Sequence, residues 1–481
     1  MDSKVAKNWI GGEWVEGASN VAVRSPADPS EVVGHYQEAS ADLVAQAVAA
    51  ARTAQKAWWR LGAVNRGNLL YQAAEVLAGQ VEDLARLASR EMGKPLAEAR
   101  GEALRAVQIL RFYAGEGARA VGEVIPAANP DVFQYTRREP VGVVGVITPW
   151  NFPLAIPMWK MAPALIYGNT VVLKPAEWSS LTAAAIFEAI ASLFPSGVMN
   201  LVLGAGRVVG DALIRAPEVD AVTFTGSVAT GAQVASVCAA RGAKYQLEMG
   251  GKNPVLVLPD ANLDAAVELA VSGAFRSAGQ KCTATSRVIV ERSVYAAFRD
   301  RLVARTRELK LGNPLEPETY LGPVVSEPQW QKVRHYIETG MAEAGAPLVG
   351  GLEKPASLAG YYVAPTIFDR VSPTATIAQE EIFGPVVALM EAEDVDDAID
   401  IANRTPFGLS ASVFTDNLSL ALKAVEELQA GLVRVNEETA GVELQAPFGG
   451  MKASSSHSRE QGRAAIEFFT TTKTVALRPI R

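Results

Sequence analysis

One cysteine stands in a segment suited to nucleophilic chemistry. Of the two cysteines, Cys238 and Cys282, the second lies in Gly279–Ser286, a loop between a predicted helix and a predicted strand. Backbone amides can converge on a sulfur in such a loop, and a nearby helix N-terminus or cation would lower the thiol pKa and produce the nucleophilic thiolate. Cys238 lies in an alanine-rich helix, which favours a small buried core residue. Taken alone, Cys282 could also be a core residue.

A carboxylate among apolar side chains is the second candidate group. Glu248 stands between Leu247 and Met249, and two glycines follow. Burial would raise the pKa of a glutamate toward neutrality, which suits a general base that takes a proton from water. A helix cap or an ion pair is the alternative explanation for Glu248.

An asparagine between two prolines is the third candidate. Asn151 lies in Thr148–Pro153, directly after a predicted strand, at the edge where open α/β sheets bind ligands. A rigidly held amide there could donate to a developing oxyanion, a contribution on the order of 3 kcal/mol. The same residues also fit an asparagine that stabilises a proline turn.

Two strand–helix junctions are candidates for binding a nucleotide. Gly226 and Gly231 follow the predicted strand Ala221–Phe224, where a pyrophosphate could approach a helix N-terminus. Their spacing is not that of the dinucleotide fingerprint, so this motif is weak by itself. Lys174 and Glu177 follow another predicted strand. Glu177 could accept hydrogen bonds from ribose hydroxyls, and Lys174 could do similar work or meet a 2′-phosphate.

Strands and helices alternate along most of the chain, and this pattern predicts what positions these residues. Strand–helix alternation predicts an α/β protein with two doubly wound parallel-sheet domains. We expect a dinucleotide-binding domain over 1–120 and 141–251, and a catalytic domain over 252–450. The predicted elements are helices over 41–80 and 81–117, strand 141–148, helix 158–166, strand 170–174, helix 180–193, strand 199–202, helix 210–216, strand 221–224, a strand near 254–258, helix 263–274, strand 287–291, helix 294–309 and strand 432–436.

A separate β arm is expected from two segments far apart in the sequence. Val121–Arg138 carries branched and aromatic residues around the turn signal Asn129–Asp131, which predicts a hairpin. A last strand is predicted at Thr472–Leu477. The small arm would comprise 121–140 and 463–481.

Length and composition exclude several classes of protein. A chain of 481 residues exceeds one compact core. The net charge is −7 with scattered lysine and arginine, so neither nucleic acid nor a membrane is expected as a partner. The chain has only two cysteines, and this low number favours the cytoplasm over an oxidising compartment. His35, His335 and His457 have no further ligand at metal-binding spacing, so no metal site is expected.

Several segments together resemble the NAD(P)-dependent aldehyde dehydrogenase family, in that family's order. The resemblance implies that Cys282 is the nucleophile, that Glu248 is the base, and that Asn151 forms the oxyanion hole with the Cys282 backbone amide. The arm would join subunits into a homodimer or homotetramer. The segments are Pro149–Pro153, Lys174–Glu177, Phe224–Ser227, Leu247–Gly251, Gly279–Cys282, Glu381–Pro385 and Pro447–Gly450.

The same resemblance implies an NAD or NADP site and a pocket for a small aldehyde. Lys174 and Glu177 would hold the adenosine ribose, Ser227 the pyrophosphate, Glu381 the nicotinamide ribose, and Phe383 would flank the nicotinamide. Charge on Glu177 disfavours a 2′-phosphate, although a movement of its side chain could admit one beside Lys174. The expected cofactor-binding residues are Ile147, Trp150, Lys174, Glu177, Gly226, Ser227, Glu381 and Phe383, and the expected substrate-pocket residues are Trp159, Thr283 and Phe448.

Within the family, three segments resemble the 2-oxoglutarate semialdehyde (2,5-dioxopentanoate) dehydrogenases: Gln280–Arg287, Gly441–Pro447 and Met451–Gly462. Glu248 favours hydrolysis of a thioester over transfer to coenzyme A. Succinate semialdehyde enzymes usually carry an arginine where this chain has Trp159, and an aromatic aldehyde such as vanillin could stack there instead. A retired protein that binds cofactor without turnover is the remote alternative.

Overall fold

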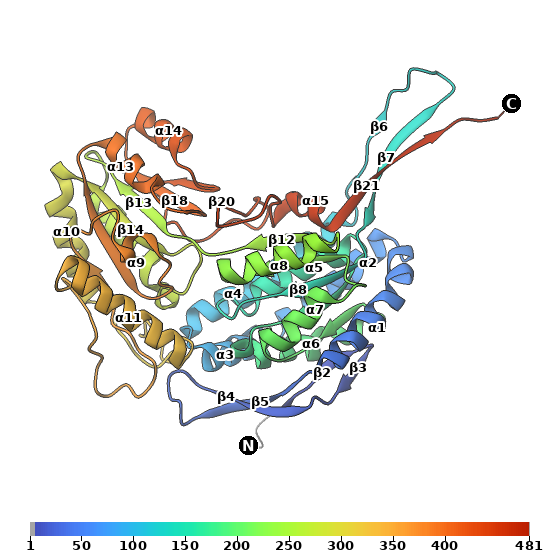
Figure 1. Cartoon of the computed structure of the whole chain (residues 1–481), viewed down its shortest axis with the longest axis horizontal. Coiled ribbons are helices and arrows are strands. Elements are labelled where there is room, and N and C mark those ends of the chain that lie inside the picture. Colours follow the sequence, from blue (N-terminus) through green and yellow to red (C-terminus); the bar gives the residue numbers. More distant parts are fainter. Residues whose placement is uncertain (1–4, 481) are drawn as a thin grey trace.

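The largest sheet has helices on both faces. The protein is described by a computed structural model over residues 5–480 (Figure 1). Seven strands follow the order β12-β11-β8-β9-β10-β2-β3, with β12 through β10 parallel and β2 and β3 added in antiparallel fashion. Their bounds are β2 Asn8–Ile10, β3 Glu13–Val15, β8 Val143–Ile147, β9 Thr170–Lys174, β10 Met199–Leu201, β11 Ala221–Thr225 and β12 Lys244–Glu248.

A second sheet of six strands is parallel throughout. Its order is β15-β16-β14-β13-β18-β19, and all neighbouring pairs run parallel. The doubly wound parallel sheets expected from the sequence are therefore confirmed. The bounds are β13 Asn253–Val257, β14 Thr285–Glu291, β15 Thr366–Phe368, β16 Val386–Ala392, β18 Ser410–Phe414 and β19 Leu432–Val435, and a separate pair joins β17 Phe407–Gly408 to β20 Met451–Lys452.

Helices cover both faces of each sheet. One core cluster packs α2 to α6 against the large sheet and another packs α1, α7 and α8 against its other face. Clusters containing α9 and α10, and α11 to α14, do the same for the second sheet. The helices are α1 Ala41–Arg60, α2 Ala63–Ala78, α3 Val81–Met92, α4 Leu96–Glu116, α5 Ala155–Ile166, α6 Ser180–Ile190, α7 Asp211–Arg215, α8 Val228–Ala240, α9 Leu263–Phe275, α10 Arg292–Arg307, α11 Glu327–Ala344, α12 Thr376–Gln379, α13 Val395–Asn403, α14 Leu418–Glu427 and α15 Ile466–Phe469.

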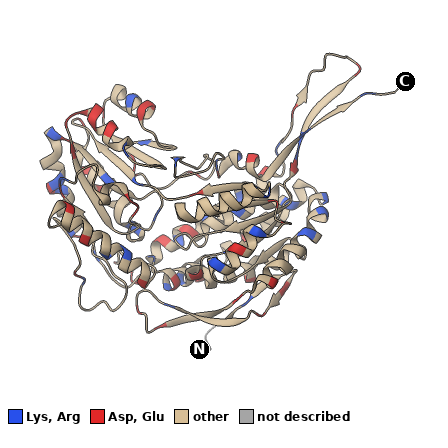
Figure 2. Ribbon diagram, in the orientation of Figure 1, with Lys and Arg blue, Asp and Glu red and all other residues tan. Residues whose placement is uncertain are grey.

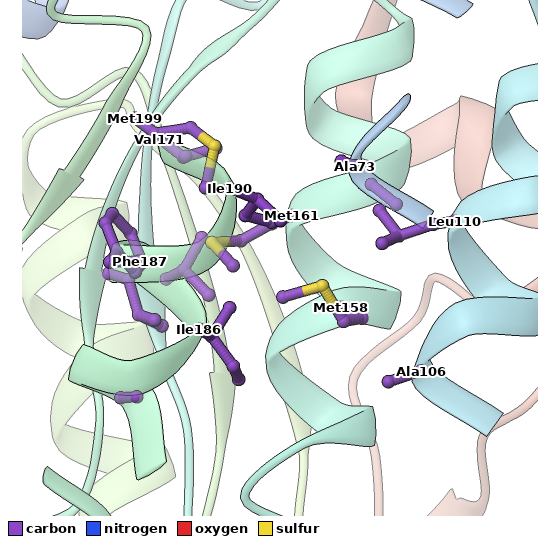
Figure 3. Close-up of a cluster of buried hydrophobic side chains, with 14 of the residues drawn as sticks. Ala73, Ala106, Leu110, Met158, Met161, Val171, Ile186, Phe187, Ile190 and Met199 are labelled. Atoms are coloured by element: carbon purple, nitrogen blue, oxygen red, sulfur yellow. The ribbon is translucent and has the colours of Figure 1, made fainter. Parts of the chain in front are cut away.

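Helix α5 is central to the core. All of its residues except Trp159 are buried, and Figure 3 shows Met158 and Met161 of this helix among side chains from α4 and α6. Burying an apolar side chain of this size stabilises the fold by about 1.5–3 kcal/mol. Because α5 follows β8 and lies beside the site described below, the core positions the side chains that this helix contributes to the site.

The predicted β arm is confirmed. Strands β6 Val124–Ile125, β7 Phe133–Pro140 and β21 Thr470–Leu477 form an antiparallel sheet in the order β21-β7-β6. The arm extends away from the two sheets (Figure 1). Its apolar side chains are largely exposed, with Val124 at 71% and Phe133 at 52%.

The N-terminal strands and the helix boundaries were not evident from the sequence. Besides β2 and β3, strands β1 Val5–Ala6, β4 Ser19–Arg24 and β5 Val32–Glu38 form a sheet of their own. These strands are short or partly exposed on both faces, so they lack a clean alternation of apolar and polar residues. The long helical region divides into four helices, with breaks at Gly62, Gln80 and Gly93.

Charge is distributed over the whole surface. Figure 2 shows lysine and arginine interspersed with aspartate and glutamate along the outer helices. Many of these residues form exposed ion pairs, such as Arg301 with Asp264 and Arg305 with Glu268. Among residues 5–480, no helix is both long enough and apolar enough to cross a bilayer.

Candidate active site

Two cavities meet at Cys282. The wide cavity has a volume of about 500 Å³ and the narrow cavity about 170 Å³, and Cys282, Ile156 and Thr225 line both. Strand β11 and helix α5 therefore contribute to both walls, while Cys282 follows the loop after α9. The wide cavity is lined by Lys94, Glu98, Gly101, Glu102, Arg105, Phe152, Ala155, Trp159, Glu248, Thr283, Arg434, Glu437, Glu438, Ala440, Gly441, Val442, Glu443, Phe448, Glu460 and Gln461, and the narrow cavity by Pro149, Trp150, Asn151, Gly226, Ser227, Met249, Gly250, Gln329, Lys332, Glu381 and Phe383.

An unusual backbone turn presents Cys282 to these cavities. Ser277, Ala278 and Gly279 all have positive φ angles between +51° and +70°. A Cβ atom at Gly279 would lie 2.2 Å from the carbonyl oxygen of Gly384, so only glycine fits there. The turn ends the helical path of α9 and leaves the Cys282 side chain half-buried at the cavity junction.

The thiol of Cys282 is neutral in this environment, and here the sequence-based expectation is wrong. Burial raises the pKa of Cys282 to about 12, and the carboxylates of Glu381 and Glu248 raise it further, while the backbone N–H groups of Thr283 and Cys282 partly offset them. The amides do converge on the sulfur, but the charged groups that face it are acids rather than cations. A proton must therefore leave the thiol before or during attack.

Asn151 is buried and fixed from two sides. Its side-chain NH₂ group donates to the backbone carbonyl of Gln280 at 3.0 Å. Its own backbone carbonyl accepts from Lys94 at 2.7 Å, and Lys94 forms a buried ion pair with Glu102 at 2.5 Å. An amide nitrogen carries two donors, so one N–H of Asn151 remains for a ligand in the narrow cavity.

Glu248 ends strand β12 and faces the wide cavity. One carboxylate oxygen accepts from the Ser455 hydroxyl at 2.5 Å, and the other is buried without a hydrogen-bond partner among the described residues. Burial raises the pKa of Glu248 well above its usual value, and the neighbouring carboxylate of Glu460 raises it further. The predicted high pKa is thus confirmed, and a serine rather than a cation is its partner.

A buried ion pair beside Glu248 was missed by the sequence analysis. Lys160 of α5 pairs with Glu460 and also donates to the Thr223 hydroxyl at 2.9 Å. Glu460 accepts from the indole N–H of Trp159 at 3.0 Å as well, which fixes the tryptophan in the cavity wall. The available signal was a lone lysine in an otherwise apolar helix. Glu460 carried no comparable signal.

Trp159, Thr283 and Phe448, the predicted substrate-pocket residues, all line the wide cavity. The rings of Trp159 and Phe448 lie 5.7 Å apart between centroids. The structure brings these residues together with Cys282 and Glu248, although they come from α5, the loop before β14 and the segment after β19.

Five of the predicted cofactor residues line the narrow cavity: Trp150, Gly226, Ser227, Glu381 and Phe383. The rings of Trp150 and Phe383 meet edge to face at 5.5 Å, and Phe383 holds a φ of +60°. Glu381 accepts from the backbone N–H of Gly251 at 3.1 Å. A Cβ atom at Gly250 would lie 2.4 Å from this carboxylate, so a side chain there would displace Glu381 from its present position.

A third cavity of about 380 Å³ is lined by two of the other predicted cofactor residues, and Glu177 lies beside it. Ile147 and Lys174 line it, and burial lowers the pKa of Lys174 to about 8. Glu177 begins a short 3₁₀ turn and accepts from the backbone N–H of Gly206 at 3.3 Å, beside this cavity. Ser227 caps helix α8, whose residues Thr230 and Val234 form another part of the wall. The start of α8 therefore borders both the narrow and the third cavity.

Comparison with known proteins assigns the family. The model of the Aldehyde dehydrogenase family matches residues 14–475. This chain is an aldehyde dehydrogenase. It is 53% identical over 477 residues to "Alpha-ketoglutaric semialdehyde dehydrogenase" of Bacillus subtilis, with 98% of each chain covered. It is 43% identical over 480 residues to "Alpha-ketoglutarate semialdehyde dehydrogenase" of Haloferax volcanii, again with 98% of each chain covered.

Solved structures confirm the aldehyde dehydrogenase fold. The NAD-dependent aldehyde dehydrogenase of Sinorhizobium meliloti superimposes with a TM-score of 0.96 at 38% identity, covering 100% of this chain and 96% of that one. Betaine aldehyde dehydrogenase of Staphylococcus aureus, solved in complex with NAD+, gives a TM-score of 0.95 at 34% identity, covering 98% and 94%. Membership of the family and the resemblance to its 2-oxoglutarate semialdehyde subgroup, both predicted from the motifs, are confirmed.

Proposed function

We propose that this aldehyde dehydrogenase oxidises 2-oxoglutarate semialdehyde to 2-oxoglutarate with an NAD-type cofactor and water. The observation that carries the proposal is the position of Cys282 where a cavity suited to an aldehyde meets one suited to a nicotinamide. The names of the relatives at 53% and 43% identity support this choice of substrate.

The donor set around the narrow and third cavities fits a dinucleotide. Glu381 would hold the nicotinamide ribose, Ser227 and the start of α8 the pyrophosphate, and Lys174 with Glu177 the adenosine ribose. Trp150, Phe383, Gly226 and Ile147 would supply the flanking surfaces. The cofactor, when bound, accepts the hydride of the aldehyde. The negative charge of Glu177 favours NAD over NADP, and parallel initial rates with the two test this preference.

Cys282 and Asn151 would carry the first half of the reaction. The Cys282 thiol would give its proton to water in the cavity, and its sulfur would bond to the aldehyde carbon, whose C=O π electrons move to the oxygen and give a tetrahedral thiohemiacetal alkoxide. The free N–H of Asn151 and the backbone N–H of Cys282 would stabilise the negative oxygen. One good donor of this kind lowers the free energy of the transition state by about 3 kcal/mol. Loss of hydride from the same carbon leaves a thioester on Cys282.

Glu248 would carry the second half. Its unpartnered carboxylate oxygen takes a proton from water, and that water attacks the thioester carbon and releases the acid together with the thiol of Cys282. A raised pKa matches this role, because a more basic carboxylate takes a proton from water more readily. Hydrolysis rather than transfer to coenzyme A is therefore the expected outcome.

A substrate panel tests the proposed function. The purified enzyme should oxidise 2-oxoglutarate semialdehyde with a higher kcat/KM than succinate semialdehyde, vanillin, benzaldehyde or acetaldehyde. Vanillin is the strongest competitor, because Trp159 and Phe448 present two aromatic rings to the wide cavity. A higher kcat/KM for vanillin would overturn the choice of substrate. A protein that binds NAD but turns over none of these aldehydes would support the retired alternative.

The proposed division of the chain follows the two sheets and the arm. Residues 1–120 and 141–251 would bind the dinucleotide, 252–450 would carry the catalytic cysteine, and 121–140 with 463–481 would join subunits. Exposed apolar side chains on the arm support an intersubunit contact. We therefore propose a homodimer or homotetramer, which light scattering coupled to size-exclusion chromatography would distinguish from a monomer.

A further inference from the structure

Two guanidinium groups that line the wide cavity have no carboxylate at ion-pair distance in the described part of the chain. Arg105 projects from helix α4 and Arg434 from strand β19, so they come from elements far apart in the sequence. Among the described residues, neither forms an ion pair, and Arg434 forms no hydrogen bond either. Charged groups in partly buried positions are normally paired, because removing them from water is unfavourable.

Arg105 is the more enclosed and better oriented of the two. It is half-buried, and one N–H donates to the backbone carbonyl of Val442, which also lines the cavity. This bond fixes the position of the guanidinium while most of its donors stay available. Burial lowers the pKa of Arg105, and Glu443 partly offsets this, but arginine remains charged at any working pH.

Most of the acidic residues of the same cavity have a hydrogen-bond partner or are exposed to water. Glu102 is neutralised by Lys94, and Glu98 accepts two hydrogen bonds from Ser277. Glu437 and Glu443 are exposed at the rim, where water screens their charge. Glu438 lies close enough to Lys281 to attract it. One carboxylate oxygen of Glu438 and one of Glu248 are buried without a hydrogen-bond partner among the described residues, so the cavity also contains acidic groups. Arg105 and Arg434 are its cations without an ion-pair partner, since Lys94 is paired with Glu102.

The proposed substrate supplies the missing anion. 2-Oxoglutarate semialdehyde has an aldehyde at one end and a carboxylate next to a ketone at the other. With the aldehyde carbon at Cys282, the charged end must occupy the wide cavity. We propose that Arg105, assisted by Arg434, binds the 2-oxo acid end of the substrate and so selects a five-carbon semialdehyde, an inference that rests on the proposed function. Planar guanidinium donors match a carboxylate in two parallel hydrogen bonds.

Selectivity between a charged and an uncharged aldehyde of equal length tests this role. The measured quantity is kcat/KM for 2-oxoglutarate semialdehyde divided by kcat/KM for pentanal. Arg105→Gln should lower this ratio at least tenfold, which corresponds to about 1.4 kcal/mol, chiefly through a higher KM for the semialdehyde. Arg434→Gln should lower it less, and Arg105→Lys should give a value between those of the wild type and Arg105→Gln.

Arg111→Gln is the matched control. Arg111 lies on the same helix, but it is exposed and pairs with Glu75 away from the cavity. This variant should keep the wild-type ratio. An Arg105→Gln variant that is folded, oxidises pentanal and keeps the wild-type ratio would overturn the inference.

A binding measurement separates failure of this inference from failure of the proposed function. 2-Oxoglutarate should inhibit pentanal oxidation competitively. Its inhibition constant should be at least tenfold higher for Arg105→Gln than for the wild type. For Arg105→Lys the inhibition constant should rise by a smaller factor. If the wild type shows no preference for the semialdehyde, the proposed function fails, whereas an inhibition constant that still depends on Arg105 would support the anion subsite. Equal inhibition of wild type and both Arg105 variants would reject the subsite.

Discussion

The narrow cavity is built largely from turns that directly follow parallel strands, whereas the wide cavity is built from segments that meet only in the folded chain. Trp150 comes just after β8 and Gly226 just after β11, both at the carboxyl edge of one sheet. In the wide cavity, Arg105 of α4 meets Val442 and Trp159 of α5 meets Glu460. The comparison teaches that a cofactor site can follow from sheet topology, while a substrate site depends on contacts between distant loops. Four changes can break or sharpen this contrast.

Removing the sulfur should have the largest effect, because Cys282 belongs to both cavities. Cys282→Ala should lower kcat by about 10⁴-fold or more. Binding of NAD should persist, because the narrow cavity keeps its other walls. Quenching of tryptophan fluorescence, to which Trp150 in this cavity contributes, measures that binding. Cys238→Ala is the control, since Cys238 is buried in α8 and lines neither cavity. Substantial NAD-dependent turnover by Cys282→Ala would refute the assigned nucleophile.

Removing the base should affect only the second half of the reaction. Glu248→Gln should lower kcat by about 10²- to 10⁴-fold, because water then attacks the thioester without general-base assistance. Stopped-flow measurement should find a rapid first turnover of reduced cofactor followed by a slow steady state. Loss of the rapid phase to the same extent as the steady state would place Glu248 in the first step instead.

The neutral thiol makes a pH-dependent prediction. With a pKa of about 12 for Cys282, its thiolate fraction rises about a hundredfold from pH 8 to pH 10, whereas that of a cysteine of ordinary pKa, about 8.5, rises only about fourfold. The rate of iodoacetamide alkylation of the enzyme without cofactor should follow the steeper dependence. Cys282→Ala supplies the background rate from Cys238. A plateau in the alkylation rate above pH 9 would show that the thiol of Cys282 is more acidic than its surroundings imply.

The smallest effect is expected at the far end of the cofactor site. Glu177→Ala should raise the KM for NAD about tenfold, because the hydrogen bonds between the ribose hydroxyls and the charged carboxylate are lost. The KM for NADP should change less, because the repulsion between the carboxylate and a 2′-phosphate disappears as well. The KM for the aldehyde should stay constant in saturating NAD. Equal changes in the KM of NAD and NADP would mean that Glu177 does not discriminate between them.

Much of the narrow and third cavities could be predicted because many of their residues follow strands of clear β pattern. The strand Thr170–Lys174 was predicted with its observed bounds, and that fixed the place of Lys174 beside the third cavity. Short motifs around Asn151, Glu248 and Cys282 then identified the groups that the fold brings together. Periodicity and turn chemistry are local properties, so a single sequence contains them.

The environment of those groups could not be predicted. The pKa of Cys282 was expected to fall, yet Glu381, about a hundred residues away in the chain, helps to raise it. Likewise, Ser455 and Glu460 meet Glu248 only through the packing of the C-terminal loop against β12. A pKa depends on burial and on charges nearby in space, and neither is written in the neighbouring residues.

The central claim is that Cys282 forms a covalent bond with the aldehyde carbon and that Glu248 assists in breaking it. Intact-protein mass spectrometry of Glu248→Gln, quenched in acid shortly after mixing with NAD and 2-oxoglutarate semialdehyde, tests it most directly. The account predicts one added acyl group per chain, and peptide mapping should place it on Cys282. An enzyme that turns over without any adduct, or that carries the acyl group on another residue, would contradict the account.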